Sequence, residues 1–212
     1  MKRILWISAL IVFLSIQVAP GHAQEEEEPS AVATDATTAL SEDAEEGEES
    51  LADLTVPGEP HELLASTVGD WDLTIKVWTA PDTEPVESAG TATGRWILGE
   101  RFVETTYQGE VMGRSFEALK IEGFESASQE YVTTWRDNLG TYTMIFRGTC
   151  SSICPIRIMM AEFLDPVSAT KLKIKGVTTL TEGDGYSYES FVVTPDGNEF
   201  KNMELVAERQ AP

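Results

Sequence analysis

The hydrophobic positions from Trp71 onward recur with a period of two. One face of this segment carries Trp71, Leu73, Ile75 and Val77, and polar residues occupy the positions between them. Because successive side chains of a β-strand point to opposite faces, this alternation predicts a strand with one buried and one solvated face. Similar runs follow at residues 86–98, 101–109, 115–124, 130–136, 141–149, 156–164, 170–180, 186–194 and 199–209.

Short segments rich in glycine, proline, aspartate and asparagine separate these runs. Connections this short force neighbouring strands to run antiparallel, because a parallel crossover needs about a dozen residues or more. A flat meander of about ten strands would leave two long unpaired edges, which closure removes. We therefore predict an all-β fold: a closed up-and-down antiparallel β-barrel of about ten strands, lined by every second side chain and preceded by a short helix within residues 60–68.

Two segments precede the predicted barrel. Residues 1–23 resemble a secretory signal peptide, with Lys2 and Arg3, an apolar run at 4–18, and small residues before a cleavage expected after Ala23. The alternative is a membrane anchor, but a spanning helix needs about twenty apolar residues. Residues 24–55 hold twelve acidic residues and no basic one, which predicts a disordered leader. The expected organisation is signal peptide 1–23, acidic leader 24–55 and barrel domain 56–212, in an exported protein that is periplasmic or secreted.

The barrel domain is acidic as well. Residues 56–212 hold 13 Lys plus Arg against 24 Asp plus Glu, a formal charge of −11. Binding to nucleic acid or to anionic lipid requires clustered cations, so neither is an expected partner. We expect no membrane span once the signal peptide is removed, and the sequence leaves the oligomeric state open.

Cys150 and Cys154 are the only cysteines, and three residues separate them. In an exported protein such a pair predicts a disulfide across a short loop. The alternatives are redox catalysis, which typically uses two intervening residues at a helix start, and a zinc site, which needs further ligands. The sequence therefore favours a structural disulfide and no metal site.

Several motifs connect the chain with known families. GDW at 69–71 opens the first strand and Arg209 stands near the end of the last, a pairing that resembles the calycin superfamily of lipocalins and fatty-acid-binding proteins. A longer set resembles the bacterial family called domain of unknown function 1579: PHELL at 60–64, VGDW at 68–71, GTAT at 90–93, ILGERF at 97–102, MGRSFE at 112–117, YVTTW at 131–135 and PDGNEFK at 195–201. The resemblance covers nearly all of residues 56–209. It implies a calycin-like barrel but no reaction, since the family has none established.

The same motif residues predict how one end of the barrel is sealed. Counting by two from Met203 along the last strand places Arg209 on the inner face. Its guanidinium would then lie over the Trp71 indole, a cation–π contact of about 0.5–2 kcal/mol. The alternative is an exposed terminal arginine. We assign structural roles to Gly69, Trp71 and Arg209.

Histidine is scarce in this chain. His22 leaves with the signal peptide and His61 precedes the strands, so no strand offers an imidazole for haem, zinc or a proton relay. Nitrobindin-like barrels, which this architecture resembles, hold haem through a histidine in the barrel. The sequence therefore predicts no haem and no other cofactor.

Carboxylates on the strands support an alternative, a carboxylate-based isomerase or hydrolase. A carboxylate buried against apolar walls has a raised pKa and serves as a general acid. Glu104 and Glu189 are the residues on which this alternative mainly depends. The simpler interpretation is that each of these carboxylates is solvated on the outer face of its strand. The full set of candidates is Glu104, Glu117, Glu122 and Glu189.

A binding site needs fewer specific residues than a catalytic site: concave apolar walls and a few polar groups that orient a ligand are sufficient. We expect a small amphipathic ligand in a cavity of several hundred cubic ångströms, with Arg101 and a tyrosine hydroxyl at its acidic headgroup. The candidate ligand-binding residues are Arg101, Tyr107, Trp135, Tyr142 and Tyr188. In one alternative these aromatic residues fill a solid core and Arg101 pairs with a surface carboxylate. In another, the protein meets a partner through its acidic leader and the barrel exterior around Trp78.

Overall fold

The computed structural model describes residues 54–150, 155–164, 170–181, 184–194 and 196–211. The predicted signal peptide, and the predicted leader up to residue 53, lie outside these ranges, as does Cys154 of the predicted disulfide. In the described ranges every helix is too short or too polar to cross a bilayer.

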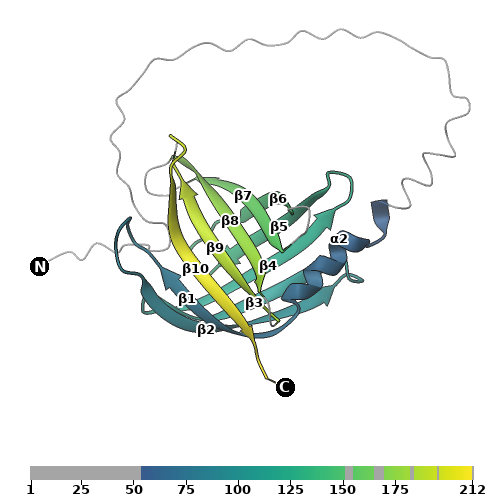
Figure 1. Cartoon of the computed structure of the whole chain (residues 1–212), viewed down its shortest axis with the longest axis horizontal. Helices are drawn as coiled ribbons and strands as arrows, with labels where there is room; N and C mark the ends of the chain where they lie inside the picture. Colours follow the sequence, from purple (N-terminus) through teal and green to yellow (C-terminus); the bar gives the residue numbers. More distant parts are fainter. Residues whose placement is uncertain (1–53, 151–154, 165–169, 182–183, 195, 212) are drawn as a thin grey trace, which may run out of the picture. The chain divides into compact units, whose positions relative to one another are not determined.

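Ten antiparallel strands of the described chain close into a barrel, as the alternating pattern predicted (Figure 1). Each strand pairs with its neighbour in sequence, and β1 pairs with β10 to complete the cylinder. The strands are β1 (Gly69–Val77), β2 (Val86–Ile97), β3 (Phe102–Val111), β4 (Arg114–Glu125), β5 (Glu130–Asp137), β6 (Met144–Cys150), β7 (Ile156–Leu164), β8 (Lys171–Thr181), β9 (Gly185–Val193) and β10 (Glu199–Arg209).

A short helical segment precedes β1 and covers one end of the barrel. It consists of α2 (Glu59–Glu62) and the 3₁₀ helix η1 (Leu63–Thr67). Leu64 of η1 is fully buried, in the same apolar cluster as Val103 and Tyr131 of the barrel wall. The Tyr131 hydroxyl also donates a hydrogen bond to the Pro60 carbonyl (3.1 Å). This end of the barrel, called the closed end below, is therefore sealed by the helical segment.

Trp71 and Arg209 complete the seal in the way the sequence predicted. Trp71 is fully buried, and its indole N–H donates to the Thr67 carbonyl (3.2 Å). The Arg209 guanidinium lies 4.2 Å from the centre of the Trp71 ring and donates to the Val68 carbonyl (3.0 Å). Gly69 has a φ of +135°, and a Cβ there would lie 2.0 Å from the guanidinium of Arg209, so glycine is required.

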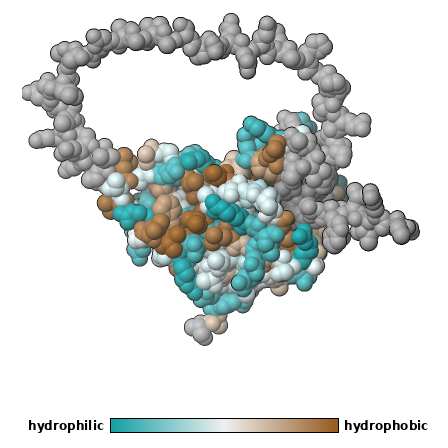
Figure 2. Space-filling model, turned by 180° about the vertical axis from the view of Figure 1, so that it is seen from behind, coloured by the Kyte–Doolittle hydropathy of each residue, from teal (hydrophilic) through white to brown (hydrophobic). Residues whose placement is uncertain are grey.

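Apolar side chains also occur on the outer surface of the barrel. Figure 2 shows them in brown, gathered beside teal polar residues on the rear face. The outward positions of β7 are unusual for an exposed strand face, because they include Ile156, Ile158, Met160 and Leu164, which are 38–61% exposed. Most side chains on both faces of strand β7 are thus apolar.

Candidate ligand-binding cavity

The lumen of the barrel contains a cavity. Its volume is about 130 Å³. For comparison, an engineered apolar cavity of about 150 Å³ binds benzene, whereas drug-sized ligands occupy roughly 300–1,000 Å³. The expectation of several hundred cubic ångströms was too large, because aromatic and methionine side chains fill much of the lumen. The cavity suits a small molecule rather than a long chain.

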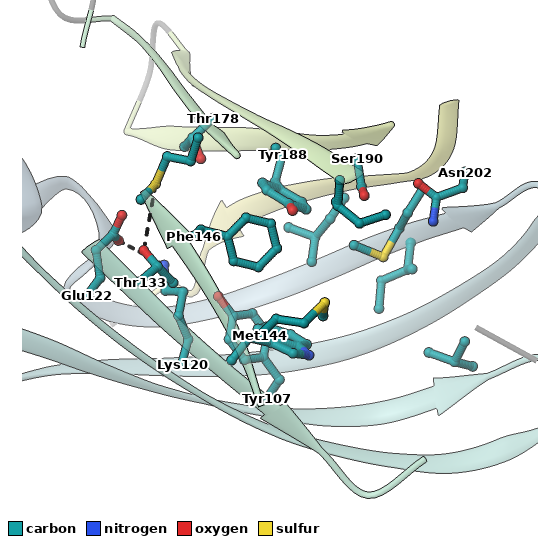
Figure 3. Close-up of a pocket in the computed structure, with 18 of the residues that line it drawn as sticks. Tyr107, Lys120, Glu122, Thr133, Met144, Phe146, Thr178, Tyr188, Ser190 and Asn202 are labelled. Atoms are coloured by element: carbon teal, nitrogen blue, oxygen red, sulfur yellow. Dashed lines mark hydrogen bonds and ion pairs between the residues drawn. The ribbon is translucent and has the colours of Figure 1, made fainter. Parts of the chain in front are cut away.

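The middle of the cavity has apolar walls. Figure 3 shows the Phe146 ring projecting into it from β6, with Met144 from the same strand and Tyr107 from β3 nearby. The apolar lining comes from strands all round the barrel because every second residue of each strand faces inward. Among the other apolar lining residues are Ile75, Phe116, Trp135, Met159, Phe163 and Ile174.

Three charged side chains lie together between the cavity and the closed end. Glu122 on β4 is 3% exposed, and its two carboxylate oxygens face two cations. Lys120 Nζ lies 3.1 Å from one oxygen, and Arg157 Nη2 lies 3.2 Å from the other. Lys120 and Glu122 line the cavity, whereas Arg157 lies behind them with its guanidinium 4.9 Å from the Tyr131 ring centre. We call Lys120, Glu122 and Arg157 the charged triad.

The triad determines the ionisation of Glu122. Burial opposes ionisation, but the Arg157 and Lys120 charges outweigh it and lower the pKa of Glu122 to about 2. This argues against the alternative in which a buried strand carboxylate has a raised pKa and acts as a general acid. Glu122 is an ionised partner of two cations and holds no proton to donate at neutral pH.

Tyrosine hydroxyls surround the cavity beside the triad. Burial raises the pKa of Tyr107, and raises that of Tyr188 to about 12 despite a hydrogen bond with Ser190. Burial and the neighbouring Tyr107 raise the pKa of Tyr186 well above its ordinary value. All three therefore stay protonated and are able to donate hydrogen bonds at neutral pH.

Two polar atoms of cavity-lining residues lack partners among the described residues. They are the Tyr186 hydroxyl and the Asn202 side-chain oxygen, on residues that are 3% and 8% exposed. The hydroxyls of Tyr107 and Tyr186 interact, which raises the pKa of Tyr186, but the geometry falls short of a regular hydrogen bond. A buried polar atom without a partner costs about 1–3 kcal/mol, so such atoms mark places where a bound molecule or water supplies the missing bond.

The structure brings four of the five predicted ligand-binding residues to this cavity. Tyr107, Trp135, Tyr142 and Tyr188 all line it. Trp135 Nε1 and the Tyr142 hydroxyl both donate to the Asp137 carboxylate, at 2.9 and 3.3 Å. Their donors are thus already engaged, and these two residues supply apolar wall.

Arg101 lies elsewhere. It belongs to the exposed turn before β3, where its guanidinium donates to the Gly99 carbonyl (3.2 Å). The prediction counted Arg101 as the first residue of the strand, but β3 begins at Phe102 and the alternation does not extend into the turn. The cation at the cavity is Lys120 instead.

The remaining predicted groups also lie outside the cavity. Glu104, Glu117 and Glu189 occupy outward positions, and Glu189 pairs with Lys201 (2.9 Å). His61 is buried in α2, where its Nδ1 accepts a hydrogen bond from the Gly58 amide (3.1 Å). In the part of the chain described here, no three His, Cys, Asp or Glu side chains are placed to hold a metal ion.

Trp78 follows β1, and the Lys201 ammonium lies 5.0 Å from its ring centre. Cys150 ends β6, and its predicted pairing with Cys154 stays a prediction.

Comparison with known proteins places this barrel in a family. The model of the family described as "Protein of unknown function (DUF1579)" matches residues 56–209. The chain belongs to this family. The match covers the barrel and its helical segment, so the cavity is a feature of the DUF1579 part of the chain. No curated protein matches.

Solved structures share the DUF1579 barrel fold of this chain. Fourteen chains match, among them the crystal structure of Rv2717c from M. tuberculosis. That protein is 15% identical, with a TM-score of 0.54 over 74% of this chain and 100% of that chain. At this identity the similarity shows the fold alone.

Proposed function

We propose that the protein is an exported carrier or sensor that binds a small amphipathic molecule inside the barrel. One observation carries the proposal: a cavity with apolar walls is bordered by Tyr186 and Asn202, each with a buried polar atom that lacks a partner among the described residues. Apolar walls favour an apolar ligand body, and the unpartnered atoms favour a polar group on it.

A cavity-blocking variant tests the proposal. Phe146→Trp enlarges a side chain that projects into the cavity, whereas Ile145→Trp enlarges its neighbour on β6, which is 53% exposed on the outer face. We expect 2-phenylethanol to shift the amide resonances of cavity residues in the wild type and in Ile145→Trp, measured by NMR titration. Phe146→Trp should abolish these shifts. Equal shifts in both variants, or shifts confined to the outer surface, would contradict binding in the lumen.

The proposed export has its own test. Expression of the full chain in a bacterial host, followed by intact-mass measurement, should show a secreted or periplasmic species that begins at Gln24. This follows from the signal-peptide pattern of residues 1–23. A cell-retained chain that still begins at Met1 would refute it.

A further inference from the structure

The charged triad, which lies between the cavity and the closed end, carries a net positive charge. The triad joins one carboxylate, Glu122, to two cations, Lys120 and Arg157, and all three side chains are at most 14% exposed. Their sum is +1. Burying an uncompensated charge is costly, so this end of the cavity favours an additional anion.

Asp137 does not supply that anion. It is the last residue of β5, two positions beyond Trp135, which is the register partner of Lys120, so it lies about 7 Å along the strand from the level of Lys120. Its carboxylate accepts hydrogen bonds from Trp135, Tyr142 and the Leu139 amide. In the described chain Asp137 forms no ion pair with Lys120, and these three donors already engage its carboxylate.

Glu122 is not available to a cationic ligand, because each of its oxygens already faces a cation. Lys120, in contrast, has three N–H donors, and its one ion pair in the described chain is with Glu122. Tyr186, with its unpartnered hydroxyl, lines the same cavity from β9, which lies across the barrel from β4.

We propose that the ligand is a small carboxylic acid in its ionised form, with its carboxylate bound by Lys120 and the Tyr186 hydroxyl. The apolar part of the ligand then lies against Phe146 and Met144. This inference rests on the proposed function, since it names the polar group of the same ligand. A carboxylate neutralises the excess charge, accepts the hydroxyl hydrogen bond and makes charge-assisted bonds that are stronger than neutral ones. An amine would meet two cations, and an alcohol would leave the charge uncompensated.

Three ligands with the same carbon skeleton test this assignment: phenylacetate, 2-phenylethanol and 2-phenylethylamine, titrated at pH 7 by calorimetry and NMR. We expect phenylacetate to bind about tenfold or more tightly than the alcohol, the scale of one charge-assisted hydrogen bond, and the amine not to bind. Lys120→Met should lower the phenylacetate affinity to that of the alcohol and leave the alcohol affinity unchanged. Tyr186→Phe should lower the phenylacetate affinity by about tenfold.

Lys173→Met is the matched control. Lys173 faces outward from β8, 59% exposed and paired with Glu162 (3.4 Å), so its loss should change none of the affinities. Unchanged alcohol binding in Lys120→Met shows that the cavity of this variant is intact.

The failure of the proposed function and the failure of the carboxylate assignment are distinguishable. If none of the three ligands binds the wild type, both the proposed function and the carboxylate assignment are refuted. If the alcohol or the amine binds at least as tightly as phenylacetate, the proposed function stands and the carboxylate assignment is overturned. The assignment is also overturned if Lys120→Met leaves phenylacetate affinity unchanged.

Discussion

The charged triad makes a sharp prediction about stability. Glu122→Gln keeps the size of the side chain but removes the negative charge between Lys120 and Arg157, which are 14% and 7% exposed. Two cations then remain inside the barrel without a counter-charge. Breaking a buried ion pair from one side typically costs about 3–5 kcal/mol.

The pKa of Glu122 gives a second route to this magnitude. It falls from an ordinary value of 4.5 to about 2, which corresponds to about 3 kcal/mol of stabilisation when the group is ionised. The two routes agree. We therefore expect Glu122→Gln to lower the free energy of unfolding by about 3–5 kcal/mol at pH 7.

The pH dependence has a definite sign. A carboxylate whose pKa is lowered by folding stabilises the folded state above its unfolded pKa, and this stabilisation is lost as the pH falls through the folded value. The difference between the wild type and Glu122→Gln should be constant from pH 7 to about 5. It should shrink between pH 4.5 and 2, the interval between the two pKa values of Glu122.

Urea denaturation followed by circular dichroism measures this difference, with Glu117→Gln as the control. Glu117 lies on the same strand but is exposed, so its replacement should change stability by less than about 0.5 kcal/mol. A loss below about 1 kcal/mol for Glu122→Gln at pH 7, or a difference that widens as the pH falls, would refute the reasoning.

Two further predictions concern the closed end. Arg209→Met removes the contact with Trp71, the hydrogen bond to Val68 and the ion pair with Asp184, and should lower the urea midpoint by the equivalent of about 1–2 kcal/mol; an unchanged midpoint would show that these contacts of Arg209 contribute nothing. Gly94→Ala would place a Cβ 2.1 Å from the Thr67 carbonyl oxygen, and should destabilise the fold by at least about 2 kcal/mol in the same assay. Gly58→Ala is its control, because the nearest atom to the new Cβ is 3.9 Å away, and equal effects of the two alanines would count against a close approach at Gly94.

The fold was predictable because most strands bury only one face. Trp71, Leu73, Ile75 and Val77 alternate with polar residues, and the short turns between such runs then fix an antiparallel order. Strand β7 shows the limit of this argument. Ile156 and Ile158 on its outer face are as apolar as Met159 on its inner face. The sequence pattern alone therefore does not show which face of β7 is buried, or that Arg157 points inward.

The site was only partly predictable. The aromatic wall residues Tyr107, Trp135 and Tyr188 follow from counting by two along their strands. The same count from Phe116 and Ala118 places Lys120 and Glu122 on the inner face, so a signal for the charged residues was present. Their pairing with Arg157 was not predictable, because it depends on which strands face each other across the lumen, and an alternating pattern holds no such information.

The central claim is that the lumen holds a small amphipathic molecule. Native mass spectrometry of the protein purified from the cells that make it, followed by solvent extraction, tests this most directly. We predict one reproducible co-purified mass, belonging to a small carboxylic acid, in the wild type and in Ile145→Trp but not in Phe146→Trp. A wild-type protein without bound mass, or the same mass retained by Phe146→Trp, would contradict the account.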